Sequence, residues 1–331
     1  LGSSGSGKST LLRMLAGMES PNQGKIILDG QDITKLAPYE RPINMMFQSY
    51  ALFPHMSVEQ NIAFGLKQDK MPKDEIAARV EEMLRLVQMT KYAKRKPHQL
   101  SGGQQQRIAL ARSLAKRPKI LLLDEPLGAL DKKLRQQTQL ELVNTLEQVG
   151  VTCIMVTHDQ EEAMTMATRI AIMSDGQLQQ VGTPSDVYDY PNSRFTAEFI
   201  GETNIFEGKV VHKDGGHALI ECDELPSKIY TDQKFDGKVD QTIWVSIRPE
   251  DIDLHKEKPA HRDTHNWAKG TVKEIAYLGS FAIYHVQMQS GRIIKSQVPA
   301  PYWYVRNITP PTWGDEVYLD WPENQPTPLT R

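Results

Sequence analysis

The stretch LGSSGSGKST, residues 1–10, decides how the first part of this chain folds. It has the form G-x-x-x-x-G-K-[ST], a phosphate-binding loop whose backbone N–H groups surround phosphate oxygens at the start of a helix. Gly2, Gly5 and Gly7 let the backbone curl closely around an anion. A β-strand normally leads into such a loop, yet only Leu1 precedes it here. The sequence therefore predicts a nucleotide site at the very start of an α/β domain.

The polar side chains of this loop predict how a triphosphate would be held. Lys8 supplies a point charge for the β- and γ-phosphates, and Ser9 offers a hydroxyl to Mg²⁺. A Gly/Ser-rich start is also typical of a linker or tag, but here it runs straight into an apolar helical pattern that stops at Gly17. The predicted nucleotide-contacting residues of the loop are Gly2, Ser3, Ser4, Gly5, Ser6, Gly7, Lys8, Ser9 and Thr10.

An apolar strand followed by two carboxylates, KILLLDEP (119–126), predicts the second half of the site. Successive side chains of a strand point to opposite faces, so Asp124 and Glu125 have different roles. Asp124 would orient Mg²⁺ or its water, and Glu125 would accept a proton from the attacking water, a role worth about 10²–10⁴ in rate. The alternative is a pair of exposed carboxylates at a strand end, which is less attractive beside a phosphate-binding loop.

A second anion-recognition surface is predicted at LSGGQQQR (100–107). Ser101, Gly102 and Gly103 place a hydroxyl and bare backbone at the N-terminus of a helix. A simple turn with a helix cap has the same sequence, and the motif alone does not separate the two. One nucleotide needs only one such cradle, so a second cradle requires a reason.

The bulk properties exclude several classes of protein. The chain has 331 residues with a formal net charge of −2, so it is not an electrostatic trap for nucleic acid. No apolar run approaches the roughly 18 residues of a membrane span. Cys153 and Cys222 are far apart, which argues against a disulfide framework and fits a reducing compartment. The length suits two or three domains.

The texture of the sequence changes along the chain. Apolar strand-like runs alternate with helical stretches up to about residue 200, which predicts an α/β domain with a largely parallel sheet and a hairpin at Asp175-Gly176. A helical insertion is expected at about residues 49–115. Short alternating runs follow residue 204 and predict a β-barrel-like domain. The predicted domains are residues 1–204 and 205–331.

Six motifs in order resemble those of the ATPase subunit of ATP-binding cassette (ABC) transporters. They are the phosphate-binding loop, Gln48 after an apolar strand, LSGGQ, LLLDEP, Asp131 in GALD and His158 in VTHD. The resemblance implies an α/β P-loop nucleotide-binding domain with a helical subdomain, followed by a β-rich, OB-like regulatory domain. It also implies a head-to-tail homodimer in which LSGGQ of one protomer closes on ATP held by the other. That arrangement would explain two cradles in each chain.

The resemblance also implies roles for individual residues. Gln48 would sense Mg²⁺ and the γ-phosphate, His158 would contact the γ-phosphate, and Asp131 would link the two sites. The catalytic set is then Glu125, His158 and Gln48, the Mg²⁺ set is Ser9, Gln48 and Asp124, and the residues acting in trans are Ser101, Gly102, Gly103, Gln104 and Asp131. Gly128 stands where many relatives carry serine. The family also has strands and an adenine-stacking aromatic residue upstream of the loop, so we expect a truncated sequence that binds ATP weakly.

The C-terminal part resembles a transport-associated regulatory domain at SIRPEDI (246–252) and AYLGS (276–280). Its β-rich texture also suits an oligonucleotide-binding barrel, but no basic and aromatic strand pattern supports nucleic-acid binding. His255, His261 and His265 suggest a metal site, yet charged residues intervene and no cysteine lies nearby. We therefore expect these histidines in a solvated loop.

Segments in both domains, among them VTHDQEEAMTMA and PTWGDEV, look most like those of the putrescine-importer ATPases of Gram-negative bacteria. This implies Mg²⁺-dependent ATP hydrolysis that energises polyamine import from the cytoplasmic face of the inner membrane. The implied partners are a second copy, two transmembrane permease subunits and, indirectly, a periplasmic solute-binding protein. The segment after Gln48, with Tyr50, Phe53 and Phe64, resembles the surface that receives a permease helix, although aromatic residues are usually core. The alternatives are import of spermidine, a sugar, iron or an oxyanion, a soluble ABC ATPase, and a small-molecule kinase.

Overall fold

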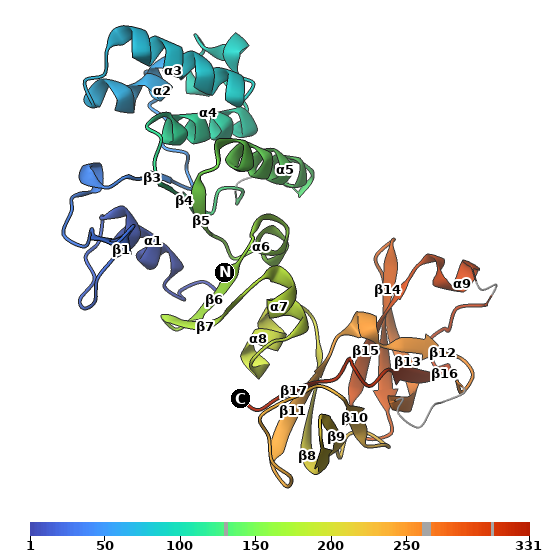
Figure 1. The fold of residues 1–331 in the computed structure, drawn as a ribbon. Coiled ribbons are helices and arrows are strands. Elements are labelled where there is room, and N and C mark those ends of the chain that lie inside the picture. The colour runs from blue at the N-terminus through green and yellow to red at the C-terminus, as the bar shows by residue number, and fades with distance from the viewer. Residues whose placement is uncertain (129–131, 260–265, 306–307) are drawn as a thin grey trace. The chain divides into compact units, whose positions relative to one another are not determined.

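The computed structural model describes residues 1–128, 132–259, 266–305 and 308–331. The chain divides into two compact units, residues 1–181 and residues 182–331 (Figure 1). Each unit has its own hydrophobic core, so each is described by itself.

Unit 1 is built around a parallel sheet with the order β3-β4-β5. Leu122 of the central strand packs with Leu12 of the first helix on one face. Leu121 and Leu123 pack on the other face with the helical insertion and Leu142. The central strand is therefore apolar throughout because both of its faces are covered. The elements of this core are α1 (Lys8–Ala16), β3 (Ile43–Met46), β4 (Ile120–Asp124), α5 (Lys132–Val149), β5 (Thr152–Val156) and α6 (Gln160–Met166).

Two antiparallel pairs complete the α/β part. The predicted hairpin is present, with Asp175 and Gly176 both in the left-handed region at φ 50° and 74°. Leu1 and Gly2 run beside this hairpin, since the Met173 amide donates to the Leu1 carbonyl at 2.8 Å and Gly2 bridges Met173 in parallel. The remaining elements are β1 (Ile27–Leu28), β2 (Gln31–Asp32), the 3₁₀ turn Pro38–Glu40, β6 (Ile170–Ser174) and β7 (Gln177–Gly182).

The helical insertion predicted at residues 49–115 contains three α-helices that share one core (Figure 1). Val58, Ile62 and Leu66 form the buried face of its first helix. Ser57 caps that helix through a capping box with Gln60. The elements are α2 (Val58–Gln68), α3 (Lys73–Leu86), α4 (Gly102–Ala115) and the 3₁₀ turns Thr90–Tyr92 and Pro97–Gln99.

Unit 2 contains two five-stranded antiparallel sheets around a single core. The first sheet has the order β10-β9-β8-β11-β17 and the second β12-β16-β13-β14-β15. The strands are β8 (Asn204–Asp214), β9 (His217–Glu221), β10 (Ile229–Thr231), β11 (Thr242–Ile247), β12 (Asp253–His255), β13 (Asn266–Tyr277), β14 (Phe281–Met288), β15 (Ile293–Pro299), β16 (Glu316–Trp321) and β17 (Thr327–Leu329). The helices are α7 (Pro184–Asp189), α8 (Arg194–Phe199), α9 (Pro301–Val305) and the 3₁₀ turn Pro249–Asp251.

The division between the units falls before the domain boundary predicted at residue 204, because α7 and α8 contact the β-rich part. Arg248 is 6% exposed and joins the two helices to the end of β11. Its guanidinium donates to the carbonyls of Tyr188, Ala197 and Glu202 at 3.0–3.1 Å and lies over the Tyr188 ring. The sequence carries no mark of this contact, since Arg248 looks like an ordinary surface residue at a strand end.

His255 does not lie in a solvated loop as expected. It is on β12 and its Nε2 is 2.6 Å from Asp320 Oδ1 on β16. The expectation failed because β12 is only three residues long, with the buried Leu254 as its single core residue. His261 and His265 lie outside the described residues.

We predict that Arg248→Met destabilises unit 2 by roughly 3 kcal/mol, since each buried carbonyl left unpaired costs about 1–3 kcal/mol. Thermal and urea unfolding would measure the change. Lys273→Met, which removes a charge from an exposed position of β13, is the matched control. Equal unfolding midpoints for the two variants would show that Arg248 does not fasten these helices.

Candidate nucleotide-binding site

The phosphate-binding loop has the backbone that its glycines predict. Gly5 and Gly7 have φ angles of 81° and 95°, which are strained for any other residue. A Cβ on Gly2 would lie 2.4 Å from the Met173 carbonyl oxygen, so only glycine fits there. α1 starts directly after Gly7, and its N-terminus carries the partial positive charge that attracts phosphate.

Lys8 lies inside this loop and is 6% exposed. Its ammonium donates to the carbonyls of Gly2 and Ser3 at 2.8 Å. Burial lowers the pKa of Lys8, and the carboxylates of Glu125 and Asp124 oppose that shift. The loop, the ammonium and the two carboxylates therefore form one electrostatic cluster.

The predicted Mg²⁺ ligands of α1 and β4 lie together. Ser9 Oγ donates to Asp124 Oδ1 at 3.3 Å. A hydroxyl and a carboxylate are hard oxygen donors of the kind that Mg²⁺ prefers, usually alongside water and substrate phosphates. These two residues therefore fit the metal. Gln48 lies beside them with its Nε2 on Glu125, so its amide oxygen is the atom that would complete the predicted Mg²⁺ set.

Glu125 connects three separate segments of the chain. Its Oε2 accepts a hydrogen bond from Gln48 Nε2 at 3.1 Å, and its Oε1 lies 3.0 Å from His158 Nδ1. Its backbone φ of 44° is in the left-handed region, a strained conformation that proteins retain mainly at functional sites. The carboxylate is thus oriented by two polar side chains at the mouth of the loop, as a general base requires.

Within the part of the chain that the structure describes, the LSGGQ segment has no hydrogen bond or ion pair with this cluster. Ser101 caps α4, and its hydroxyl accepts the Gln104 amide at 3.4 Å while the Gln104 side chain accepts the Ser101 amide at 3.0 Å. A Cβ on Gly103 would meet nothing within 4 Å. Ser101, Gly102, Gly103 and Gln104 thus form an open helix tip with its own capping box, and the side-chain hydrogen bonds described for Ser101 and Gln104 are with each other.

Asp131 lies outside the described residues, so its predicted role stays a prediction. Gly128 in the same GALD segment is described. A Cβ there would meet the Glu125 carbonyl oxygen at 3.6 Å and Gln48 Nε2 at 3.7 Å, ordinary contact distances. The serine of many relatives would therefore fit at this position.

Sequence reasoning missed Arg112, which holds the loop that follows Gln48. Tyr50 and Ala51 have φ angles of 59° and 45°, two consecutive strained residues. The Arg112 guanidinium donates to both of their carbonyls, at 2.9 Å and 2.8 Å, and lies 5.5 Å from the centre of the Phe53 ring. Arg112 is on α4, the helix that Ser101 caps. The only sequence signal is a basic residue in the last turn of that helix.

Asn61 fastens the rest of the same loop from α2. It is fully buried, and its Oδ1 accepts the Phe53 amide at 2.8 Å. Its Nδ2 donates to the carbonyls of Phe53, Met56 and Ser57 at 3.0–3.3 Å. The segment after Gln48 is therefore an ordered connection between the cluster and the helical insertion. Phe53 and Phe64 contact each other there at 4.5 Å between ring centres.

Comparison with known proteins points to one family. The sequence profile described as "ABC transporter" matches residues 1–128, and that described as "TOBE domain" matches residues 245–326. The chain is 59% identical to the putrescine transport ATP-binding protein PotG of Escherichia coli, over 97% of this chain and 84% of the relative. It is 47% identical to the spermidine/putrescine import ATP-binding protein PotA of Chromobacterium violaceum, over 90% of this chain and 82% of the relative.

A solved structure agrees with the fold of the first unit. It is cbiO1 from Clostridium perfringens, described as part of the ABC transporter complex cbiONQ. The identity is 33% and the TM-score 0.53, over 56% of this chain and 76% of that chain. Within the described ranges, no helix has the length and apolar character needed to cross a membrane.

We predict that Arg112→Met lowers the maximal rate of nucleotide hydrolysis by at least about tenfold, equivalent to about 1.4 kcal/mol in the barrier. The loop after Gln48 would lose two charged hydrogen bonds and relax from its strained backbone. Nucleotide affinity should change little, because Arg112 lies outside the phosphate-binding loop.

Steady-state kinetics and binding of a fluorescent nucleotide separate these two effects. The matched control is Arg85→Met, an exposed arginine of α3 whose ion pair is with Glu81. A fall in affinity with an unchanged maximal rate, or the same effect in the control, would contradict a positioning role for Arg112.

Proposed function

Because this chain belongs to the ABC transporter family, among its ATP-binding proteins, we propose that its ATPase activity drives the import of a polyamine, with putrescine as the substrate. The observation that supports catalysis is the Glu125 carboxylate, oriented by Gln48 and His158 beside the phosphate-binding loop. The choice of polyamine rests on the relatives, which are described as putrescine and spermidine/putrescine transporters.

In the proposed reaction, the backbone N–H groups of the loop and Lys8 bind the β- and γ-phosphates. Bound Mg²⁺, held by Ser9 and Asp124, would supply charge neutralisation on the phosphate oxygens. Glu125 accepts a proton from the attacking water while the oxygen of that water forms a bond to the γ-phosphorus. The bond to the bridging oxygen breaks, and ADP and phosphate are the products. His158 keeps the carboxylate oriented and contacts the γ-phosphate.

We assign the second half of each site to another copy of the chain. Ser101, Gly102, Gly103 and Gln104 offer a second helix N-terminus at the start of α4. In a head-to-tail homodimer they would meet the γ-phosphate held by the partner's loop, and Asp131 would connect the two sites. This arrangement gives the second cradle a ligand.

The loop after Gln48 is the proposed route from the nucleotide to the membrane partners. Gln48 contacts Glu125, and the next residues are fastened to the helical insertion by Arg112 and Asn61. Loss of the γ-phosphate would therefore change the conformation of this surface. Two transmembrane permease subunits would dock there, with the chain held peripherally at the cytoplasmic face of the inner membrane and a periplasmic solute-binding protein delivering the polyamine.

The other readings have less support. Import of another solute remains the nearest alternative, because solute choice would reside in the permeases and the binding protein. A soluble ABC ATPase that acts on nucleic acid is disfavoured by the polyamine-transport descriptions of the relatives. A small-molecule kinase has no use for LSGGQ.

We predict that Glu125→Gln abolishes hydrolysis, with a loss of at least about 10², while ATP affinity stays within about twofold. The amide keeps the shape of the side chain but accepts a proton poorly. Size-exclusion chromatography with ATP should show a dimer that the parent protein forms only transiently. Cells that carry the variant in the complete transporter should lose uptake of radiolabelled putrescine.

The control is Glu161→Gln, an exposed carboxylate in the first turn of α6. Undiminished turnover of Glu125→Gln would remove Glu125 from the base role. If Glu125→Gln abolished ATP hydrolysis but cells that carry it in the complete transporter took up putrescine normally, the ATPase assignment would stand and the polyamine assignment would be overturned.

A further inference from the structure

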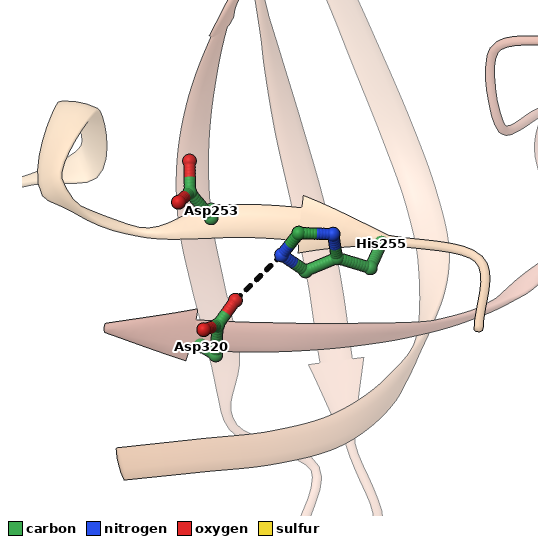
Figure 2. Close-up of side chains that lie close together, drawn as sticks. All are labelled: Asp253, His255 and Asp320. Atoms are coloured by element: carbon green, nitrogen blue, oxygen red, sulfur yellow. Dashed lines mark hydrogen bonds and ion pairs between the residues drawn. The ribbon is translucent and has the colours of Figure 1, made fainter. Parts of the chain in front are cut away.

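The outward face of the second sheet of unit 2 brings together three side chains that the proposed function does not use (Figure 2). Asp253 and His255 are two residues apart on β12, so both side chains leave the same face of the strand. Asp320 on β16 is the direct cross-strand partner of Asp253. The ligand atoms of all three residues lie within 4.8 Å of one another.

The three groups differ in how firmly they are held. His255 Nε2 lies 2.6 Å from Asp320 Oδ1, as the dashed line in Figure 2 shows. The side chains of His255 and Asp320 are 29% and 12% exposed, whereas Asp253 is exposed. Two of the donors are thus held by a mutual contact and by partial burial, whereas the Asp253 carboxylate is open to solvent.

From this geometry we propose that Asp253, His255 and Asp320 bind a divalent transition-metal ion of the zinc type. One imidazole nitrogen and two carboxylates are a donor set that suits Zn²⁺, with water as the fourth ligand. Zinc bonds of about 2.0–2.2 Å in a tetrahedron hold two donor atoms roughly 3.3 Å apart. The His255–Asp320 pair therefore opens by roughly 0.7 Å, and the Nε2 proton moves to Nδ1 or to solvent.

The position of the site gives the ion a structural effect. β12 is an edge strand of three residues, attached to β16 through the pairs at Asp253, Leu254 and His255. A metal bound by side chains of both strands would cross-link this short edge and protect it from fraying. The ion would therefore raise the stability of unit 2 rather than take part in hydrolysis.

Charged neighbours on the same face limit the affinity. Trp267 of β13 is the other cross-strand partner of Asp320, and the Lys258 ammonium lies 4.5 Å from its ring centre. Lys269 lies over the Tyr318 ring and pairs with Glu316, so its charge is partly balanced. Lys258 repels a cation at the site, and Lys258→Gln should tighten metal binding.

The test uses the full chain, freed of metal, with Zn²⁺ alone in isothermal titration and Co²⁺ alone in visible absorption. We expect the unsubstituted chain to bind one metal ion, and we expect the visible d–d absorption of bound Co²⁺ to be that of a four- or five-coordinate ion. Asp253→Asn keeps the His255–Asp320 pair and should weaken Zn²⁺ binding at least about tenfold. Mutation of residues that only hydrogen-bond to metal ligands already costs about tenfold or more in metal affinity. His255→Asn should do the same and should abolish the Co²⁺ spectrum.

The matched control is His217→Asn, an exposed histidine of β9 in the other sheet, which should bind as the parent does. Circular dichroism without metal checks that each variant folds. If His255→Asn does not fold, Asp253→Asn still tests the proposal. Either of two results would overturn the proposal. One is an unchanged Zn²⁺ affinity in Asp253→Asn, and the other is no Zn²⁺ binding by the parent protein at about 0.1 mM Zn²⁺, roughly the dissociation constant of weak extracellular metal-binding modules.

Discussion

The hydrogen bonds of the Glu125 carboxylate are the interaction on which the rest of the first unit depends. Gln48 follows β3, Glu125 follows β4 and His158 follows β5, and these three strands are parallel neighbours. The carboxyl ends of parallel strands lie at the same edge of their sheet, so three residues that are distant in sequence come together there as a result of the sheet topology alone. The phosphate-binding loop reaches the same edge through the contact of Ser9 with Asp124.

This arrangement also explains how a local chemical event could act at a distance. The cluster contacts the helical insertion through the strained loop after Gln48, which is fastened by Arg112 and Asn61. A strained loop that is held by a few charged hydrogen bonds has two states, one with these bonds formed and one with them broken. Elements of this kind serve as switches. Arg112 belongs to the helix whose tip we assign to the partner's nucleotide, so one rigid element touches both the loop and the second site.

The sequence predicted which residues gather in the cluster because they occur in short motifs next to strands and helices. The alternation of apolar runs with helical stretches likewise predicted the parallel sheet, the Asp175-Gly176 turn predicted the hairpin, and apolar residues at helical spacing predicted the helical insertion. Contacts made by single long side chains were not predictable. Arg112, Arg248 and His255 each bind groups far away in sequence, and nothing in their local pattern marks a partner. The role of Asp131, which lies outside the described residues, stays a prediction. The trans role of Ser101 needs a second copy of the chain and also stays a prediction.

The claim that one nucleotide is shared by two protomers is tested most directly by cross-linking. Ser4→Cys and Ser101→Cys, made in separate copies of the Glu125→Gln protein and mixed, place one thiol on the loop and one on the helix tip. The account predicts a disulfide between the two copies that forms only with ATP and Mg²⁺ present. A closed, ATP-bound dimer in which these positions never cross-link, while Ser4→Cys joins readily to another surface, would contradict it.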